Sequence, residues 1–382
     1  MESYEAVIVG GGPAGSTTAY RLATAGVKTL VLDRAHFPRE KPCGGGVTLR
    51  GAKQLPFSID PVVETTASAI DFRLQYGAES RHAYDAPIVL MTRRSRLDAY
   101  LLEKAAEAGA EVRQGARVRE LRPDLSRPEA IGDGFRVKAD VILGADGANG
   151  VCAAAIGSAR SQWDALAYEG NADRALYSSP RYENSMLFEV GTVPGGYAWI
   201  FPKGDHTNFG VGGWFREGPQ MKAHLARLCG SHGVDVDRLS GVRGYRIPLR
   251  GPDTQVFLGR FALIGDAAGL ADPLSGDGMY EAFTSGRLAS ENALRILGGH
   301  DRDFSRYRAA LRAELGRHSA ISWLAKLILE RRPRAGYRIA TSKIAGRLFY
   351  GDVSGTRSVR LPLPAPAAGS LQRLAQTRLL PA

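Results

Sequence analysis

The stretch EAVIVGGGPAGSTTAYRLATAGVKTLVLD, residues 5–33, decides the fold of this 382-residue chain. The apolar run 6–9 leads into three glycines spaced Gly-x-Gly-x-x-Gly, and a helix-compatible segment follows to about residue 25. A second apolar run, residues 29–32, ends in an acidic residue. Two short apolar runs separated by a helical segment are the pattern of a βαβ unit. We therefore predict an α/β fold that opens with such a unit.

The spacing of the three glycines has a mechanical reason. Gly10 permits a tight turn from strand to helix, Gly12 lets the backbone approach a pyrophosphate, and Gly15 lets helix and strand pack closely. The helix start then directs unpaired N–H groups and a positive dipole end toward the anion. Asp33 lies where a carboxylate accepts hydrogen bonds from ribose hydroxyls. Because these features occur in order, we predict a dinucleotide site rather than a glycine-rich turn alone.

Length and composition limit the class of protein. With 44% hydrophobic residues the chain can bury a large core, and its length predicts two domains and a tail. No uncharged apolar run reaches the roughly 20 residues of a spanning helix, and the N-terminus enters a strand directly, which argues against a signal peptide. Cys43, Cys152 and Cys229 form no disulfide framework and fit a reducing cytoplasm. No Cys and His cluster has metal-ligand spacing, so we predict no metal site.

The net charge of +11 is concentrated at one end of the chain. Residues 301–382 hold 16 Lys and Arg against 5 Asp and Glu, whereas residues 1–300 are balanced. Within them, residues 331–351 mix basic and apolar side chains as an amphipathic surface element does. Anionic lipid head groups, a diphosphate or a solvated basic face each account for this charge, and nucleic acid is disfavoured because no binding motif accompanies it. A lipid partner implies a cytoplasmic protein that lies peripherally at the inner membrane face.

Two features follow the opening unit. Residues 41–45, Lys-Pro-Cys-Gly-Gly, cannot be the interior of a strand, because glycine offers nothing to pack. We interpret them as a loop that passes close to a flat ligand, with a flexible connector as the alternative. Further on, Ser95-x-x-Asp98 predicts a capping box that opens a helix.

From Ser185 the apolar pattern changes to a period of two. Tyr197, Trp199 and Phe201 fall on one strand face, with small or aliphatic residues between them on the other. This pattern predicts an antiparallel sheet, a different architecture from the opening unit. The aromatic stripe is either core or the wall of an apolar trough for a long hydrophobic ligand.

Two further turns resemble ligand-binding edges of a parallel sheet. The apolar run 139–143 ends in Gly-Ala-Asp-Gly at residues 144–147, where the carboxylate would stand at the sheet's carboxyl edge. A second run ends in Gly-Asp-Ala-Ala-Gly at 265–269, followed by Asp-Pro-Leu-Ser-Gly-Asp-Gly-Met at 272–279. A helical segment, 280–297, comes next, and N–H groups at its start can stabilise negative charge on a reduced flavin ring.

In this order the motifs resemble the FAD-dependent geranylgeranyl reductase family, within the flavoproteins that share the p-hydroxybenzoate hydroxylase fold. The wider match rests on the glycine fingerprint with Asp33 and on the turns at 144–147, 265–269 and 272–279. The narrower match rests on the loop 41–45 and on Tyr197-x-Trp-x-Phe-Pro202. The resemblance implies an α/β chain, α+β overall, with a Rossmann-like FAD-binding domain, an antiparallel-sheet substrate domain and a helical C-terminal tail.

The implied domains are discontinuous in sequence. Residues 1–60, 90–160 and 245–300 would form the FAD-binding domain, and residues 61–89 and 161–244 the substrate domain. Residues 301–382 would form the basic helical C-terminal region.

The resemblance also implies roles for individual residues. Tyr197, Trp199 and Phe201 would line a cavity for an isoprenoid. This chain departs from many relatives at Gly150 and Cys152, where those have Ser and Arg. It also has Gly-Asp-Gly-Met at residues 276–279, where relatives often have Gly-Glu-Gly-Ile. The implied FAD contacts are Gly10, Gly12, Pro13, Ala14, Gly15, Asp33, Arg34, Cys43, Gly44, Arg94, Val118, Asp146, Gly265, Asp266, Pro273, Gly276, Asp277, Gly278 and Met279.

The implied reaction is reduction of C=C double bonds in a geranylgeranyl or other polyprenyl group. FADH2 supplies the hydride, and the protein holds the alkene in place and excludes water. Cys43 and Tyr197 are the candidate catalytic residues, because either side chain could donate the proton, as could a water molecule or the flavin. Only one dinucleotide fingerprint is present, so the reductant would be transiently bound NAD(P)H or a ferredoxin-type donor.

Two other readings stay open. A flavin-dependent monooxygenase or halogenase has the same fold, and halogenases carry a comparable aromatic strand, although the loop 41–45 favours the reductase. A flavoprotein that carries an isoprenoid without catalysis is the third reading.

Overall fold

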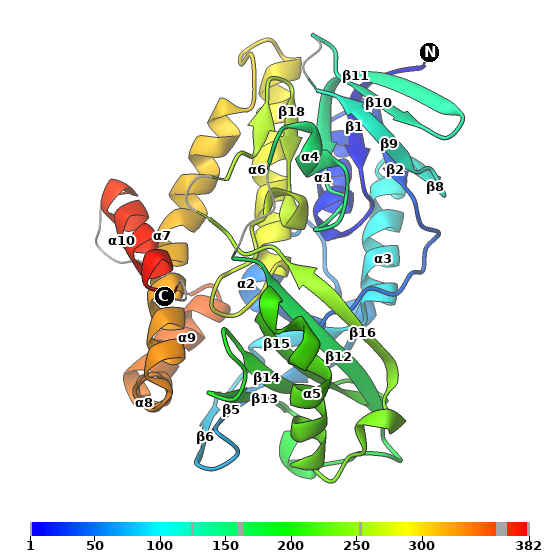
Figure 1. Ribbon diagram of the computed structural model, residues 1–382. Helices are drawn as coiled ribbons and strands as arrows, with labels where there is room; N and C mark the ends of the chain where they lie inside the picture. The colour runs from blue at the N-terminus through cyan, green and yellow to red at the C-terminus, as the bar shows by residue number, and fades with distance from the viewer. Residues whose placement is uncertain (1, 124–125, 159–162, 252–253, 357–364, 380–382) are drawn as a thin grey trace.

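The computed structural model describes residues 2–123, 126–158, 163–251, 254–356 and 365–379. It confirms the α/β fold with a second, largely antiparallel sheet and a helical C-terminal region. In Figure 1 the sheet that contains the N-terminal strand lies above, the second sheet lies below, and the C-terminal helices run along one side of both.

The N-terminal sheet has a parallel centre. Its strand order is β8-β2-β1-β11-β18-β17, and a β9/β10 hairpin pairs with β11. The pairs β1/β2, β1/β11, β2/β8 and β11/β18 are parallel, as the opening βαβ pattern predicts. Its strands are β1 (Glu2–Val9), β2 (Thr29–Asp33), β8 (Glu111–Gln114), β9 (Val118–Arg122), β10 (Glu129–Gly132), β11 (Phe135–Gly144), β17 (Phe257–Leu258) and β18 (Phe261–Leu263).

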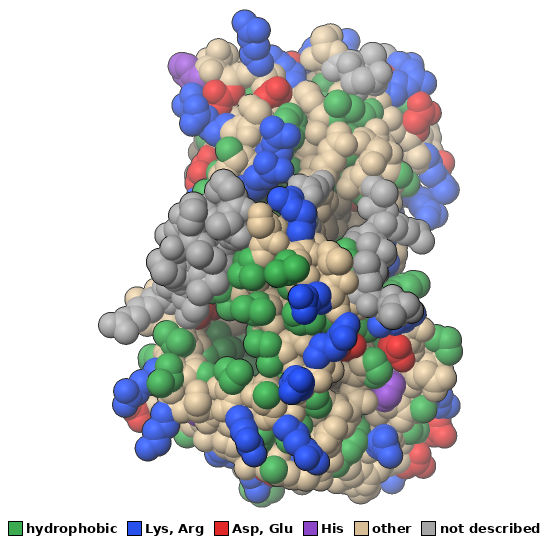
Figure 2. Space-filling model, turned by 60° about the vertical axis from the view of Figure 1, so that its left-hand side comes forward, with side chains coloured by type: hydrophobic (Ala, Val, Ile, Leu, Met, Phe, Trp, Pro, Cys, Tyr) green, Lys and Arg blue, Asp and Glu red, His purple; other side chains and the backbone are tan. Residues whose placement is uncertain are grey.

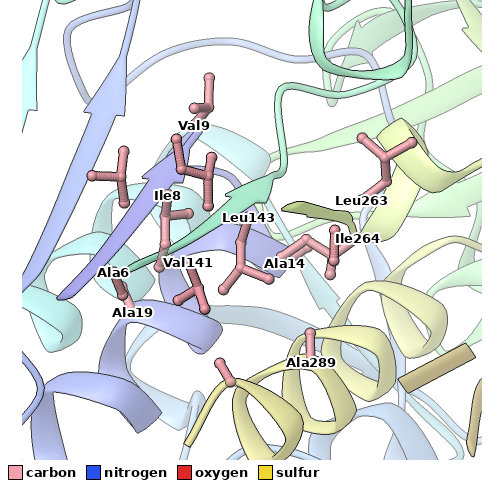
Figure 3. Close-up of a cluster of buried hydrophobic side chains, with 14 of the residues drawn as sticks. Ala6, Ile8, Val9, Ala14, Ala19, Val141, Leu143, Leu263, Ile264 and Ala289 are labelled. Carbon is pink, nitrogen blue, oxygen red and sulfur yellow. The ribbon is translucent and has the colours of Figure 1, made fainter. Parts of the chain in front are cut away.

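Helices α1 (Pro13–Thr24), α3 (Arg94–Glu107) and α6 (Met279–Leu297) pack together beside this sheet. Small side chains let the helices approach the sheet closely. In Figure 3, Ala14 and Ala19 of α1 and Ala289 of α6 face the apolar side chains of the strands. Contact between α1 and α6 is closer still at Gly286, where a Cβ would lie 2.7 Å from the hydroxyl of Thr18.

The helix α3 does not have the predicted capping box. Arg93 is its N-cap and offers no side-chain cap. The Asp98 carboxylate instead accepts two hydrogen bonds from Arg94, both of 2.8 Å. The capping prediction was wrong because a charged partner one turn away competes for the same carboxylate.

The second sheet has the strand order β16-β12-β15-β14-β13-β5-β6. All its pairs are antiparallel except β13/β5, which is parallel because the chain leaves this sheet after β6 and returns much later to β13. Helix α5 (Met221–Gly230) covers one face and buries Ala198 and Ile200 of β14. Its strands are β5 (Ala69–Leu74), β6 (Glu79–Ala83), β12 (Ala165–Asp173), β13 (Ser185–Val190), β14 (Tyr197–Pro202), β15 (His206–Trp214) and β16 (Ser240–Ile247).

A small third sheet, β3-β7-β4, lies next to the loop at residues 41–45. Its strands are β3 (Gly46–Thr48), β4 (Val63–Ala67) and β7 (Val89–Thr92), with α2 (Leu49–Ala52) directly after β3. Residues 61–89 therefore do not all belong to the second sheet, because β4 pairs with β7 whereas β5 and β6 pair with β13 and with each other. Short elements complete this part: α4 (Cys152–Ala155) and the 3-10 turns Asp60–Val62, Pro180–Tyr182, Phe215–Gln220, Val236–Arg238 and Gly265–Ala268.

The described part of the C-terminal region forms four helices: α7 (Ser305–Arg331), α8 (Pro333–Ala340), α9 (Lys343–Val353) and α10 (Ala365–Leu379). Trp323 of α7 and Gln372 of α10 both donate to the carbonyl of Arg250, at 3.0 and 3.2 Å, which helps to hold these two helices against the rest of the protein. Of the predicted region 301–382, residues 357–364 and 380–382 lie outside the described part. Within the described residues, no helix combines the length and apolar character needed to cross a bilayer.

Candidate active site

A cavity of about 710 Å³ separates the carboxyl edge of the N-terminal sheet from the second sheet. It falls in the volume range typical of small-molecule and cofactor sites. All the residues that the resemblance assigned to FAD or isoprenoid line this cavity, except Gly15. The structure therefore brings together residues that are up to 269 positions apart in sequence, from Gly10 to Met279, with Arg34 and Val118 among them.

The glycine fingerprint lies at one end of the cavity, where Gly10 and Gly12 line its wall. Gly10 has a φ of +109°, and a Cβ there would lie 2.4 Å from the carbonyl oxygen of Ala145. Gly15 lies beneath the cavity, where a Cβ would be 1.9 Å from the oxygen of Gly10, so it serves close packing of helix on strand. Gly12 is the N-cap of α1 and offers no side chain to the first N–H groups. This uncapped helix start, approached by bare backbone, fits a pyrophosphate.

Asp33 fastens the glycine loop. Its Oδ2 accepts from the N–H of Gly11 at 2.6 Å, and its Oδ1 accepts from the N–H of Ala35 at 2.8 Å. The side chain is buried, yet it lines the cavity. It can therefore hold the loop and still offer its remaining lone pairs to a ribose.

Three cations, Arg39, Lys41 and Arg94, also line the cavity, and the sequence analysis did not single out the first two as site residues. Arg39 reaches to 3.3 Å from the position of a Cβ on Gly12, and it pairs with Asp98 at 3.0 Å. Arg94 is buried against the same carboxylate, and although burial opposes its charge, Asp98 raises its pKa further. Lys41 pairs with Asp266 at 3.0 Å, so that burial lowers but this carboxylate raises the lysine pKa, with a net rise. The sequence does show basic residues beside the glycine-rich loop at residues 41–45. Which carboxylates they meet depends on the path of that loop, and the path is set by the fold.

The turn at residues 144–147 explains one of the departures from the family pattern. The Oδ2 of Asp146 accepts from the N–H groups of Val151 and Cys152, at 2.6 and 3.0 Å. A Cβ at Gly150 would lie 1.9 Å from the carboxyl carbon of Asp146, so this turn requires glycine there. Cys152 is fully buried at the start of α4. Burial raises the pKa of Asp146 in spite of the two N–H groups.

The start of α6 faces the cavity as predicted. Gly276 has a φ of +66° and Gly278 is the N-cap, with no side-chain cap. Asp277 accepts from the N–H of Met279 at 2.8 Å, and burial raises its pKa. Pro273 and Gly265 line the cavity beside them. This long helix thus directs a second N-terminus, with glycine at the N-cap, toward a bound ligand.

Aromatic rings form the opposite wall. Tyr197, Trp199 and Phe201 alternate along β14 with neighbouring ring centroids 6.0 Å apart, and Phe188 of β13 lies 5.3 Å from the first and last of them. The loop packs on this wall, because a Cβ at Gly44 would lie 2.7 Å from the ring of Phe201. Of the two interpretations of this strand, core or cavity wall, the lining of the cavity by all three rings favours the second.

A polar flank adjoins the aromatic wall, and no sequence motif predicts it. Glu169 of β12 accepts from the N–H of Cys43 at 2.6 Å through Oε1. Lys203, at the end of β14, donates to the carbonyls of Gly44 and Thr92, the latter at 3.1 Å. Burial raises the pKa of Glu169 to about 7 and lowers that of Lys203 to about 8.

Cys43 and Tyr197, the predicted catalytic residues, both border the cavity. The sulfur of Cys43 accepts from the N–H of Gly45 at 3.3 Å. The hydroxyl of Tyr197 donates to the carbonyl of Ser275, and burial raises the pKa of Tyr197. Tyr197 is therefore a weak acid whose proton is already engaged.

Comparison with known proteins places this cavity in context. Residues 3–173 match the FAD binding domain family. The chain is 32% identical over 313 residues to the chloroplastic geranylgeranyl diphosphate reductase of Oryza sativa, covering 74% of this chain and 65% of that protein. It is 31% identical over 326 residues to the geranylgeranyl diphosphate reductase of Rhodobacter capsulatus, covering 82% and 81% of the two chains. It is also 31% identical over 312 residues to the menaquinone reductase of Mycolicibacterium smegmatis, covering 75% of each.

Solved structures share the whole fold at lower identity. A geranylgeranyl bacteriochlorophyll reductase-like protein of Thermoplasma acidophilum superposes with a TM-score of 0.75 at 20% identity, over 99% of this chain and 98% of that one. The myxobacterial chondrochloren halogenase superposes with a TM-score of 0.74, also at 20% identity, over 100% and 98% of the two chains. The fold therefore accommodates both reductases and halogenases.

Proposed function

Because this chain belongs to the FAD-dependent geranylgeranyl reductase family, we propose that it reduces C=C double bonds in a geranylgeranyl or other polyprenyl group. One observation carries the proposal: one cavity joins the starts of α1 and α6 to a wall of aromatic rings. A cofactor with a pyrophosphate fits the first part, and a long apolar chain fits the second.

The residues present fit FAD. Gly10, Gly12 and the start of α1 would hold the pyrophosphate, with Arg39 to neutralise it, and Asp33 would hold the ribose. Residues 273–279 would border the flavin ring, beneath the loop of Cys43. When bound, reduced FAD supplies a hydride.

The chain's own residues supply position and environment. The rings of Tyr197, Trp199 and Phe201 would hold the alkene against the loop side of the cavity and exclude water from it. Their π faces also attract positive charge that develops on a carbon during reduction. A polyprenyl chain is the ligand class that uses such a wall along its length.

Cys43 is proposed to position the substrate or help deliver the proton, because its place in the loop sets its thiol at the cavity surface. The variant Cys43→Ala tests this role. We expect flavin binding to persist and turnover to fall. Unchanged turnover would leave the thiol a small packing group.

The reaction is tested with photoreduced, flavin-loaded protein in the absence of oxygen. Addition of geranylgeranyl diphosphate or a polyprenyl quinone should return the flavin to its oxidised spectrum and add two hydrogen atoms per double bond, measured by mass spectrometry. A parallel sample with oxygen and halide separates the alternative, since a halogenated or hydroxylated product with no alkene reduction would overturn the proposal. A flavin that no polyprenyl compound reoxidises would indicate a carrier without catalysis.

NAD(P)H or a ferredoxin-type protein is the proposed reductant. Anaerobic mixing of oxidised holoprotein with NADPH, NADH or reduced ferredoxin distinguishes them by the rate at which flavin absorbance bleaches.

We further propose that α8 and α9 rest on an anionic membrane surface. Residues 331–350 contain six Lys and Arg and no acidic residue, and all six side chains are exposed. None of the six forms an ion pair with a described carboxylate. Four of the largest exposed apolar side chains of the described residues lie among them: Ile339, Ile344, Leu348 and Phe349, from 37% to 72% exposed. In Figure 2, which turns this side forward, hydrophobic side chains gather in the middle of the face with Lys and Arg around and below them.

This surface adjoins the cavity. Phe349 and Val353 of α9 belong to the cavity lining, and α9 is fastened by the ion pair of Asp352 with Arg50 at 2.6 Å. A lipid-resident polyprenyl chain could then enter without crossing water. Each basic residue near an anionic bilayer contributes about 1 kcal/mol to the binding free energy.

Co-sedimentation with phosphatidylglycerol and phosphatidylcholine vesicles tests this docking. We expect the full chain to bind the anionic vesicles, less at high salt, and the double variant Ile344→Ser, Leu348→Ser to bind several-fold less. Phe215→Ser is the matched control, since Phe215 is a similarly exposed apolar residue, 52% exposed, outside this surface. Equal binding by the double variant and the control would contradict the docking.

A further inference from the structure

Glu169 is a buried carboxyl that the family resemblance leaves without a role. Its side chain lines the cavity and is 6% exposed. One oxygen, Oε1, accepts from the N–H of Cys43 at 2.6 Å. The other, Oε2, is buried and has no hydrogen-bond partner among the described residues. A buried polar atom in a cavity wall without a partner indicates a group that meets a ligand.

The register of the sheet sets this carboxyl beside the aromatic wall. Glu169 on β12 pairs with Gly210 on β15, and Gly210 pairs with Trp199 on β14. Directly paired residues present their side chains on the same face, so all three positions face the cavity. Gly210 has no side chain, and a Cβ there would lie 2.1 Å from the Trp199 ring, so that ring lies over the Gly210 backbone.

The charged groups that face Glu169 are Lys203, Arg94 and Arg243. None of them forms an ion pair with it among the described contacts; Lys203 bonds loop carbonyls, and Arg94 bonds Asp98. Burial therefore outweighs these cations and the Cys43 N–H, and the pKa of Glu169 rises to about 7. A carboxyl in this state holds a proton near neutral pH and can also release it, as a general acid must.

We propose that Glu169 is the acid that delivers the proton to the double bond, from Oε2. The inference rests on the proposed function. In the step, the O–H bond of Glu169 breaks and its proton forms a C–H bond at one alkene carbon, while the hydride from reduced FAD forms the C–H bond at the other. The alkene would thus gain two hydrogen atoms at the expense of the reduced flavin, which would end oxidised, and the Glu169 carboxylate would regain a proton from water.

The contact with Cys43 offers a different role, in which Glu169 only positions the loop. The variant Glu169→Gln separates the two, because the amide oxygen of Gln still accepts from the Cys43 N–H but the side chain has no acidic proton. Glu189→Gln is the control for loss of a buried carboxyl in the same sheet, since Glu189 is fully buried, pairs with Arg73 at 2.6 Å and does not line the cavity.

The first measurement is an infrared titration of the FAD-loaded wild type and both variants. We expect a protonated-carboxyl band that disappears as the pH passes about 7, that is absent from E169Q, and that persists in E189Q. Because burial also raises the pKa of other carboxyls, Glu281 among them, the readout is the difference between wild type and E169Q. A band titrating near pH 7 that is equally strong in both proteins would overturn the proposal, because the proton would then belong to another group.

The second measurement is single-turnover reoxidation of reduced flavin by a polyprenyl substrate without oxygen. Wild-type reoxidation should slow as the pH rises through the same value, and E169Q should be about 100-fold slower or more, with a flat pH profile and unchanged FAD affinity. Wild-type rates in E169Q would overturn the proton delivery while leaving the reductase function intact. A wild type that reduces no polyprenyl compound would overturn both.

Discussion

The cavity face of the second sheet has two sides of opposite character. Strands β13 and β14 contribute the aromatic rings of Phe188, Tyr197, Trp199 and Phe201, whose neighbouring centroids lie 5.3–6.0 Å apart. Strands β12 and β15 pair with each other beside β14, and they contribute Glu169, Asn171, Asn208 and the glycines between them. The aromatic side can hold an apolar chain. The polar side, through Glu169, can hold a proton and also bonds the loop at residues 41–45.

The two sides meet at Trp199. Its Nε1 donates to Asn208 at 2.7 Å, and the Asn208 amide donates to Asn171 at 2.9 Å. The indole thus has its ring in the aromatic wall and its polar atom in the polar flank. Variants at this junction and on either side show how far each side depends on the other.

Loss of the Trp199 ring should have the largest effect. Trp199 is 6% exposed, and Trp199→Ala would remove the centre of the wall and leave the Asn208 oxygen without its donor. We expect the free energy of unfolding to fall by about 3–5 kcal/mol, as for other buried aromatic truncations. Urea unfolding followed by circular dichroism measures it. The control Trp199→Phe keeps most of the ring, and a similar loss in both variants would mean that the hydrogen bond, not the ring, dominates.

The pH dependence of stability should expose the polar flank. The pKa of Glu169 is about 7 in the folded protein against an ordinary 4.5, so between these values the folded state binds more protons than the unfolded state. Its contribution to the unfolding free energy therefore falls as the pH rises from about 4.5 to 7, by at most about 3 kcal/mol.

Urea unfolding of wild type and E169Q at pH 5 and pH 8 checks this sign. Wild type should lose stability relative to E169Q at the higher pH. Parallel pH dependences of the two proteins would show that Glu169 does not titrate in this range.

A pair of glycines on β15 tests how tightly the two sides fit. A Cβ at Gly210 would lie 2.1 Å from the Trp199 ring, whereas one at Gly212 would lie 3.4 Å from it. We expect Gly210→Ala to lower the unfolding free energy by about 1–3 kcal/mol through overpacking, and Gly212→Ala to change it by less than about 1 kcal/mol. Both are measured by urea unfolding of matched preparations. Equal effects would indicate that β15 moves as a unit rather than that Trp199 is displaced.

The aromatic side could be predicted from the sequence, and the polar side could not. Alternation in β14 marks large side chains on one face whatever the strand pairs with, so Tyr197, Trp199 and Phe201 were visible. Glu169 lies in a strand of ordinary alternation, and nothing local distinguishes it from a surface carboxylate. Its burial depends on the loop of Cys43, which is more than a hundred residues away in sequence.

The same contrast holds for the N-terminal half. Its glycine fingerprint and βαβ order are local signals, so the parallel sheet and the helix starts were predicted. The ion pairs of Lys41 with Asp266 and of Arg39 with Asp98 join separate motifs, and no spacing rule predicts them. The capping box at Ser95 failed for a related reason, because Asp98 has two arginine partners that compete with the helix N–H groups.

The outer end of the polar flank should give the smallest effect. Asn171 is the last member of the chain that begins at the Trp199 indole, and it is partly exposed, so water can replace it. Asn171→Ala should therefore lower the unfolding free energy by only about 0.5–1 kcal/mol. The more informative effect of this substitution is on the orientation of the Asn208 side chain. Without Asn171 the Asn208 amide loses the acceptor that fixes its NH2 group on the outer side, and the bond to Trp199 becomes easier to break.

Nuclear magnetic resonance of 15N-labelled indoles measures this directly. The Trp199 Nε1–H signal, assigned with Trp199→Phe, should exchange with solvent several-fold faster in Asn171→Ala than in wild type, while the other indole signals stay unchanged. An unchanged Trp199 exchange rate would show that Asn208 is held by its burial alone, 3% exposed, and that the junction of the two sides needs no support from the rim.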